Sequence, residues 1–256
     1  MHEDKHFIDI HTHILPGVDD GSVDIEETIV MLQIAYDSGT RGIVATPHMF
    51  LDLFKNNDFL EIRDRFDRFK EELEPYHSTF PFLREMDVYL GAENYASVEF
   101  LEALDQGCVL TLNGSRYLLL EVPFSSPFRQ IEAFLERILA TDYLPVIAHV
   151  ERYAAVQEDP LRLEPLWRRG CVVQVNARSL AGSSGSRPKN CAEKLIQAGV
   201  LDVIATDGHR PRWRPPDLQG VYLYLEKEYG REDALRWMTE NPRMILANQR
   251  LDAART

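Results

Sequence analysis

The chain has 256 residues, of which 27% are charged, and a formal net charge of −13. This composition is typical of a folded soluble protein. This acidity argues against broad binding to nucleic acid or to an anionic membrane surface. No apolar run approaches the roughly 20 residues that span a bilayer, so we expect no direct membrane insertion. The length, without an obvious linker or repeat, predicts a single domain over residues 1–256, although length alone also allows two small domains.

The cysteines indicate a reducing environment. Cys108, Cys171 and Cys191 are odd in number and widely spaced, which argues against a disulfide framework or a cysteine-based zinc site and predicts buried packing for all three. The N-terminal segment MHEDKHFIDI has no basic stretch followed by an apolar one, as a signal peptide would have. Together these features predict a cytoplasmic protein.

Short apolar segments alternate with amphipathic ones along the chain. We predict strands at 7–10, 42–46, 88–91, 117–120, 144–148, 172–175 and 203–206, mostly near-continuous apolar runs of the kind covered on both faces. Helices are predicted at 25–35, 57–74, 97–105, 128–141, 160–169, 188–198, 217–229 and 231–247, the last interrupted or adjusted at Pro242. The small polar segment 178–188 is predicted to be a surface loop.

Seven βα-like units imply a parallel sheet. A closed barrel is the economical arrangement of so many units, although an open doubly wound sheet would show the same alternation. Periodicity alone therefore leaves the closure of the sheet open.

The first strand runs into His11-Thr12-His13. Residues two apart in an extended chain face the same side, so the two imidazoles can converge on one cation. By itself this pair is weak evidence, because exposed histidines and hydrogen-bonded core histidines are common.

Further nitrogen and oxygen ligands recur at the ends of later strands, where active sites on parallel α/β scaffolds lie. Each alone has a structural explanation: Glu121 could pair with an arginine, and His149 could be a hydrogen-bonded core residue. Burying all of them without partners would be costly, so together they predict a metal site. The candidates are His11, His13, Asp19 or Asp20, His48, Glu93, Glu121, His149, Asp207 and His209.

Histidine and carboxylate ligands without thiolate suit Mn²⁺, Fe²⁺ or Zn²⁺, and more than four ligands indicate more than one ion. Two neighbouring ions can hold a hydroxide between them and clamp the attacking and leaving oxygens of a phosphate. The residues themselves therefore predict a metal-dependent hydrolase.

Several sequence blocks carry a family resemblance. IDIHTHILPGVDDGS, GAENY, LTLNGSRYLLLEVPF, AHVERY and VQVNARSLAG resemble the bacterial manganese-dependent protein-tyrosine phosphatases of the polymerase and histidinol phosphatase (PHP) superfamily. The resemblance extends from about Ile8 to the segment NPRMILAN. It implies a distorted (β/α)7 TIM-like barrel with its active site at the C-terminal ends of the strands.

The resemblance also implies three divalent metal ions, with Mn²⁺ as first choice and Fe²⁺ or Zn²⁺ as alternatives. The first ion would be held by His11, His13, Glu93 and Asp207. Glu93 would bridge to the second, which Glu121 and His149 complete. Asp20, His48 and His209 would hold the third. Asp20 matches the family's position, whereas Asp19 can be explained as a turn residue before Gly21.

Arginines are expected to satisfy the phosphate oxygens that the metals leave free. Arg152, in HVERY, matches a family position for gripping phosphate, although an ion pair with Glu151 or another carboxylate is the alternative. After His209 the arginines 210, 212 and 214 compete, and spacing favours Arg214. Pocket-lining roles for Asn176 and Arg178 compete with helix-capping and loop roles. Aromatic residues expected near the mouth, with core packing as the default for each, are Phe50, Phe54, Tyr95, Phe124, Phe128 and Trp213.

The resemblance implies hydrolysis of phosphotyrosine by a metal-activated hydroxide. The implied partner is a phosphotyrosine-containing protein, such as a membrane-associated tyrosine autokinase of capsule or exopolysaccharide synthesis. His48 and His209 are candidates for protonating the leaving group, a role that metal ligation opposes. Two alternatives remain: a PHP phosphoesterase for a small molecule such as histidinol phosphate, and a non-catalytic partner of a polysaccharide-export kinase.

Overall fold

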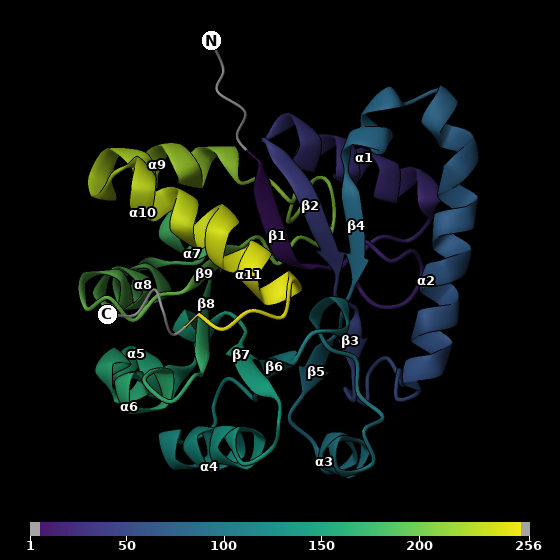
Figure 1. Cartoon of the computed structure of the whole chain (residues 1–256). Coiled ribbons are helices and arrows are strands. Elements are labelled where there is room, and N and C mark those ends of the chain that lie inside the picture. Colours follow the sequence, from purple (N-terminus) through teal and green to yellow (C-terminus); the bar gives the residue numbers. More distant parts are fainter. Residues whose placement is uncertain (1–5, 252–256) are drawn as a thin grey trace.

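The computed structural model describes residues 6–251, in which parallel strands curl around an interior and helices cover the outside (Figure 1). Residues 1–5 and 252–256 belong to the predicted domain, and the first five also to the segment assessed for a signal peptide. They lie outside the described residues.

All seven predicted strands are present, and two short ones were not predicted. β3 and β5 follow β2 and β4 after two residues each, at Thr46-Pro47 and Gly91-Ala92. Proline cannot donate a ladder hydrogen bond, so the break between β2 and β3 has a local cause. The strands are β1 (Phe7–Thr12), β2 (Thr40–Ala45), β3 (His48–Met49), β4 (Asp87–Leu90), β5 (Glu93–Tyr95), β6 (Tyr117–Glu121), β7 (Leu144–Ile147), β8 (Val172–Asn176) and β9 (Val203–Ala205).

The strands form two parallel sheets, with the orders β1-β2-β4 and β3-β5-β6-β7-β8-β9. Because β3 continues β2 and β5 continues β4, seven strand positions surround one interior. The last position meets the first: the Asp207 amide donates to the His11 carbonyl (2.9 Å), and the His13 amide donates to the Gly208 carbonyl (2.7 Å). The predicted distorted (β/α)7 barrel is confirmed, with its distortion at the two interrupted positions.

Helices pack against the outer face of the strands (Figure 1). Asp24 and Asp58 cap the first two through side-chain oxygens that accept backbone amide hydrogen bonds. The cap at Asp58 explains why the second helix starts at Phe59 and not at residue 57. The helices are α1 (Ile25–Asp37), α2 (Phe59–Leu73), α3 (Val98–Asp105), α4 (Phe128–Leu139), α5 (Ala154–Glu158), α6 (Glu164–Trp167), α7 (Ala177–Leu180), α8 (Ser186–Gln197), α9 (Gln219–Tyr229), α10 (Arg231–Leu235) and α11 (Asn241–Leu246).

One loop prediction and one helical prediction need correction. The segment 178–188 is not a loop throughout, because α7 occupies its start and α8 begins at Ser186. The predicted helix 160–169 divides into a 3₁₀ turn (Pro160–Leu163) and α6. The predicted helix 231–247 has the expected adjustment near Pro242: a π-helical turn (Arg236–Glu240) joins α10 to α11, and Pro242, which has no amide hydrogen to donate, lies in the first turn of α11.

Side chains alternate between two hydrophobic clusters. In β6, Leu118 and Leu120 face the helices, whereas Tyr117 and Leu119 face the interior together with Val146 of β7. This interior cluster is completed by Ile245 and Leu246 of α11. Apolar side chains therefore fill the barrel at the amino ends of the strands, which leaves the carboxyl ends for polar groups.

Cys171 and Cys191 are buried as expected, but Cys108 is only half-buried, because it follows the turn at Gly107 that ends α3. Between residues 6 and 251, no helix combines the length and the hydrophobicity needed to cross a membrane.

Candidate metal centre

The polar candidates lie at the carboxyl end of the barrel. In β6, Glu121 continues the inward series of Tyr117 and Leu119, and in β8 Gln174 continues the inward position of Val172. The inward face of each strand therefore carries apolar side chains first and oxygen-bearing side chains near the strand's carboxyl end. Glu121 and Gln174 point inward because every second side chain of a strand lies on the same face.

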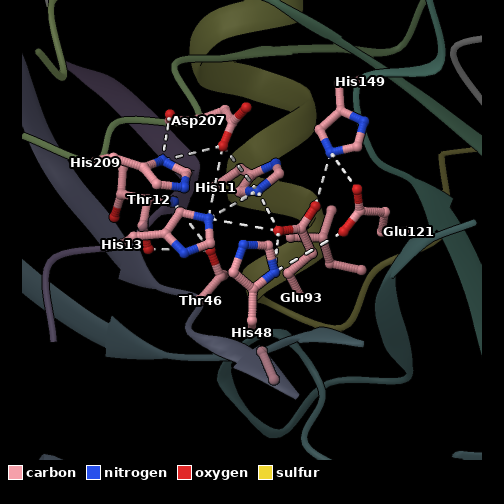
Figure 2. A network of polar contacts seen from close by, with 12 residues as sticks. His11, Thr12, His13, Thr46, His48, Glu93, Glu121, His149, Asp207 and His209 are labelled. Carbon is pink, nitrogen blue, oxygen red and sulfur yellow. Dashed lines mark hydrogen bonds and ion pairs between the residues drawn. The ribbon is translucent and has the colours of Figure 1, made fainter. Parts of the chain in front are cut away.

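Glu93, at the start of β5, is the centre of the cluster (Figure 2). Its Oε2 lies 3.3 Å from His11 Nε2, 3.4 Å from His13 Nε2 and 3.0 Å from His48 Nδ1. Its Oε1 lies 2.8 Å from His149 Nε2. Four imidazoles thus converge on one buried carboxylate.

Three histidines have the Nδ1 side of the ring held by an oxygen. His11 Nδ1 donates to Gln174 Oε1 (3.1 Å), which also accepts the His149 amide hydrogen. His13 Nδ1 donates to Asp19 Oδ2 (2.7 Å), and His209 Nδ1 donates to the Asp207 carbonyl (2.9 Å). A neutral imidazole that donates through Nδ1 presents a lone pair at Nε2, so each of these rings can ligate a cation.

The two neighbouring aspartates lie in different places. The side chain of Asp19 is buried, and its carboxylate accepts from His13 Nδ1, from the His48 amide (3.0 Å) and from the Gly21 amide (2.9 Å). Asp20 instead points Oδ1 towards His209 Nε2 (3.3 Å) and His48 Nε2 (3.6 Å). Asp19 therefore orients histidines, and Asp20 is the aspartate that faces two candidate ligands.

Gly21 lets the loop that carries both aspartates approach β1. A Cβ added there would lie 2.0 Å from the His13 carbonyl oxygen. Only glycine permits this approach without movement of the backbone.

Asp207 has two differently occupied oxygens. Its Oδ1 lies 3.6 Å from His11 Nε2, 3.5 Å from His13 Nε2 and 3.4 Å from His209 Nδ1. Its Oδ2 accepts from Asn176 Nδ2 (2.8 Å) and Arg214 (2.7 Å), and Arg152 lies 3.5 Å away. One carboxylate thus links the histidine cluster to two arginines.

A tight turn places the three arginines after His209 in different surroundings. The amides of His209 and Arg210 both donate to the Arg214 carbonyl, which brings Arg214 back to the cluster. Arg210 instead pairs with Glu27 (3.8 Å), and Arg212 is exposed. Among these three arginines, Arg214 is the one that lines the cavity over the cluster, as spacing favoured.

Buried negative charge is the strongest indication of a cation. Glu93, Glu121 and Asp207 are each at most 8% exposed. Burial and the neighbouring Glu93 raise the pKa of Glu121 to about 8. Burial also acts to raise the pKa of Glu93, but His11 and His48 outweigh it and hold that pKa well below its usual range. Carboxylates this close repel one another, and bound cations would relieve that repulsion.

Unsatisfied atoms support the same conclusion. Within the described chain, buried side-chain atoms without a hydrogen-bond partner include three that face the cluster, Asp20 Oδ1, His48 Nδ1 and His209 Nε2. Buried polar atoms are normally paired, so ligand atoms left over in one place fit metal binding. The donor set, histidine nitrogens and carboxylate oxygens, suits divalent transition metals.

Geometry alone divides the ligands into three overlapping groups whose ligand atoms lie within 4.8 Å of one another. They differ from the implied sets because His13 and His48 each belong to two groups, and His149 and Asp207 to none. His149 Nε2 nevertheless lies 2.8 Å from Glu93 Oε1 and 3.9 Å from Glu121 Oε1. The groups are His13, Asp20, His48 and His209; His11, His13 and Glu93; and His48, Glu93 and Glu121.

The aromatic candidates separate into lining and core residues. Phe54 stacks on His48 with ring centroids 5.2 Å apart, and with Phe124 it lines a cavity of about 200 Å³ over the cluster. Trp213 is 60% exposed and lines a neighbouring cavity. Phe50 and Phe128 are buried in the core, which is the default expected for each, so neither lies at the mouth. Tyr95 is half-buried and lines neither cavity.

Comparison with known proteins identifies the family. Residues 7–247 match the family described as capsular polysaccharide synthesis, CpsB/CapC. The tyrosine-protein phosphatase CpsB of Streptococcus pneumoniae is 32% identical over 253 residues, covering 94% of this chain and 99% of that protein. The chain belongs to the CpsB/CapC family. This confirms the narrower of the two resemblances found in the sequence.

Solved structures share the fold. A structure described as belonging to YwqE from Bacillus subtilis and CpsB from Streptococcus pneumoniae, unique metal-dependent tyrosine phosphatases, superposes with a TM-score of 0.84 at 33% identity. It covers 94% of this chain and 95% of that one. The lactonase Lmo2620 from Listeria monocytogenes, at 13% identity and a TM-score of 0.59 over 95% of both chains, shares the fold alone.

Proposed function

We propose that this chain is a metal-dependent protein-tyrosine phosphatase of capsule or exopolysaccharide synthesis, with the cluster around Glu93 as its active centre. The observation that carries the proposal is the convergence of four imidazoles and further buried carboxylates on Glu93, beneath a cavity that two arginines line. The proposed substrate is a phosphotyrosine-bearing protein, and a tyrosine autokinase of the same system is the proposed partner.

The proposed cation ligands are the nine residues at the strand ends. Bound divalent cations would supply an acidified water as nucleophile and neutralise the charge on the phosphoryl oxygens. The chain's own contribution is to fix the ring orientation of the ligands, through Gln174 for His11 and Asp19 for His13. The ligands are His11, His13, Asp20, His48, Glu93, Glu121, His149, Asp207 and His209.

Arg152 and Arg214 are proposed to bind the phosphoryl group. Both lie at Asp207 Oδ2 and line the cavity over the cluster, so their guanidinium groups are already directed to where a phosphate would lie. Guanidinium donors match the geometry of phosphate oxygens and stabilise the charge that develops there during transfer. Phe54 and Phe124 offer apolar walls for the tyrosyl ring.

The leaving tyrosyl oxygen requires little assistance, because phenol has a pKa of about 10. His209 Nδ1 donates to the Asp207 carbonyl and its Nε2 faces Asp20, so its ring has no N–H directed at the cavity. The proposal therefore assigns His48 and His209 to cation binding and requires no proton from either.

The proposed function is tested by comparing substrates on the manganese-loaded protein. We expect hydrolysis of a phosphotyrosyl peptide with a kcat/KM at least about tenfold above that for histidinol phosphate, because the apolar walls bind an aromatic ring. Preference for histidinol phosphate would assign the chain to small-molecule hydrolysis. No hydrolysis of either, with metal content verified, would support a non-catalytic role.

Replacing Arg214 with alanine should lower kcat/KM for a phosphotyrosyl peptide by about 100-fold, because a phosphate-binding donor is lost. Arg214→Lys should recover only part of this loss, since lysine restores the charge but not the two-pronged geometry. Arg212→Ala is the matched control, because it removes an exposed arginine from the same turn. Equal activity of the Arg214→Ala and Arg212→Ala variants in steady-state assays would rule out the assigned role.

A further inference from the structure

A second cavity adjoins the one over the metal centre. It has a volume of about 460 Å³ and shares Phe124, Arg152, Asp207 and Arg214 with the first. Its remaining lining comes from α5, from the end of β8, from α7, α8 and the segment between them, and from the turn after His209: Gln157, Asn176, Arg178, Ser183, Ser184, Pro188 and Trp213. A side chain close to a bound phosphotyrosine can therefore enter it without crossing the protein.

Arg178 is the cation that this second cavity adds. It lies on α7 between Ala177 and Ser179, which are both buried, whereas Arg178 itself is only half-buried. The carboxylate of buried Glu151 anchors this segment by accepting from Ser179 Oγ (2.5 Å) and from the Asn176 amide (3.3 Å). The backbone beneath Arg178 is therefore held in place.

The guanidinium of Arg178 has no partner of its own: across residues 6–251 it makes neither a hydrogen bond nor an ion pair. The carboxylate in the lining, Asp207, already holds Arg214 at 2.7 Å and Arg152 at 3.5 Å through Oδ2. Partial burial and the neighbouring Arg214 lower the pKa of Arg178, although an arginine remains charged.

The lining of this cavity contains three arginines and one aspartate, in a chain whose net charge is −13. A local excess of positive charge attracts anions even on an acidic protein. A phosphate on the metal centre would engage Arg152 and Arg214 and leave Arg178 for a second anion.

We propose that this second cavity is a subsite for an anionic side chain next to the phosphotyrosine in sequence, and that Arg178 selects it. The inference rests on the proposed phosphatase function. The anion is a carboxylate or a second phosphate, because both accept from guanidinium. Exposed Trp213 forms one wall, with the Arg214 guanidinium 4.7 Å from its ring centroid. Ser183 and Ser184 supply hydroxyl donors on the α8 side.

The test uses phosphotyrosyl peptides of one length on the full-length, manganese-loaded protein. One peptide has alanine on both sides of the phosphotyrosine. Further peptides place a single glutamate, or a second phosphotyrosine, at each position from −3 to +3. For at least one position we expect the anionic peptide to exceed the alanine peptide about tenfold in kcat/KM, since a hydrogen bond to a charged group is involved. The glutamate and phosphotyrosine peptides show which anion is preferred.

In the Arg178→Ala variant, the ratio of kcat/KM for the anionic peptide to that for the alanine peptide should fall to about 1. Arg178→Lys should retain part of the preference. Arg187→Ala is the matched control, because Arg187 is an exposed arginine at the start of α8 that lines neither cavity. The ratio between two peptides on one protein preparation cancels differences in folding or metal content. The preference of the wild-type protein should also fall as salt is raised.

Two negative results remain distinguishable. If every peptide is hydrolysed but with equal efficiency, or if Arg178→Ala keeps the preference, the subsite is refuted and the phosphatase function stands. If no peptide is hydrolysed, the phosphatase function itself fails, and the subsite fails with it.

Discussion

Removal of divalent cations with a strong chelator should lower phosphotyrosyl-peptide turnover by about 1000-fold or more, and Mn²⁺ should restore it. The reason is the composition of the cluster. Glu93, Glu121 and Asp207 are buried beside five histidines, and the Nε2 atoms of His11 and His13 face the carboxylate of Glu93. Neither arginine at the cavity can replace the cations, because a guanidinium does not bind a water and acidify it to a hydroxide nucleophile.

The chelator should be removed by gel filtration before the assay, so that it cannot bind the added metal. Restoration should be compared among Mn²⁺, Fe²⁺ and Zn²⁺, and metal content measured on the same samples. Cations that bind only the folded chain should also raise its unfolding temperature, which is a readout independent of activity. Full turnover in protein shown to be free of metal would overturn the metal mechanism.

His149→Ala should remove at least about 99% of kcat while the chain stays folded, as judged by circular dichroism. His149 Nε2 lies 2.8 Å from Glu93 Oε1 and 3.9 Å from Glu121 Oε1, so the imidazole is placed to complete a site with both carboxylates. Its loss should lower bound metal as well as turnover. Near-normal kcat with full metal content would exclude His149 as a ligand.

The backbone at His149 calls for a second variant. This residue is left-handed, with φ 33° and ψ 49°, a conformation that alanine adopts poorly. Asparagine tolerates it better, so His149→Asn separates backbone strain from the lost imidazole. We expect His149→Asn to unfold at a higher temperature than His149→Ala and to be equally inactive. Activity recovered in the asparagine variant would assign the defect to the backbone.

The strand ends could be predicted from the sequence because apolar runs stop where ligand-type residues begin. Glu121 follows the run Leu118–Leu120, and its inward direction follows from the same period of two that buries Leu119. Short elements could not be predicted in this way. Helix α7 has four residues in a small polar segment, too few for a helical period to show. Strands β3 and β5 have two and three residues.

The contacts that orient the proposed ligands could not be predicted from the sequence, because they join residues that only the fold brings together. Gln174 reaches His11 across 163 positions of sequence, and nothing in the residues around either predicts that contact. The sequence did place Asp19 beside the proposed ligand Asp20, but only as a turn residue. The hydrogen bond between its carboxylate and His13 Nδ1 depends on the close approach of the loop to β1 at Gly21, which the sequence does not show. Similarly, Arg214 was favoured over Arg210 by spacing, whereas the physical reason is the return of the chain at Arg214.

The two carboxylate oxygens of Asp207 face different partners, and this links the binding of cations to the binding of phosphate. Oδ1 faces three histidines of the cation cluster, and Oδ2 holds Arg214 and approaches Arg152. A cation bound by this cluster would draw the negative charge towards Oδ1, weaken the hold of Oδ2 on the arginines and free them for phosphate. Cation affinity and phosphate affinity would then be reciprocally coupled, each raising the other by the same factor, because one side chain would serve both.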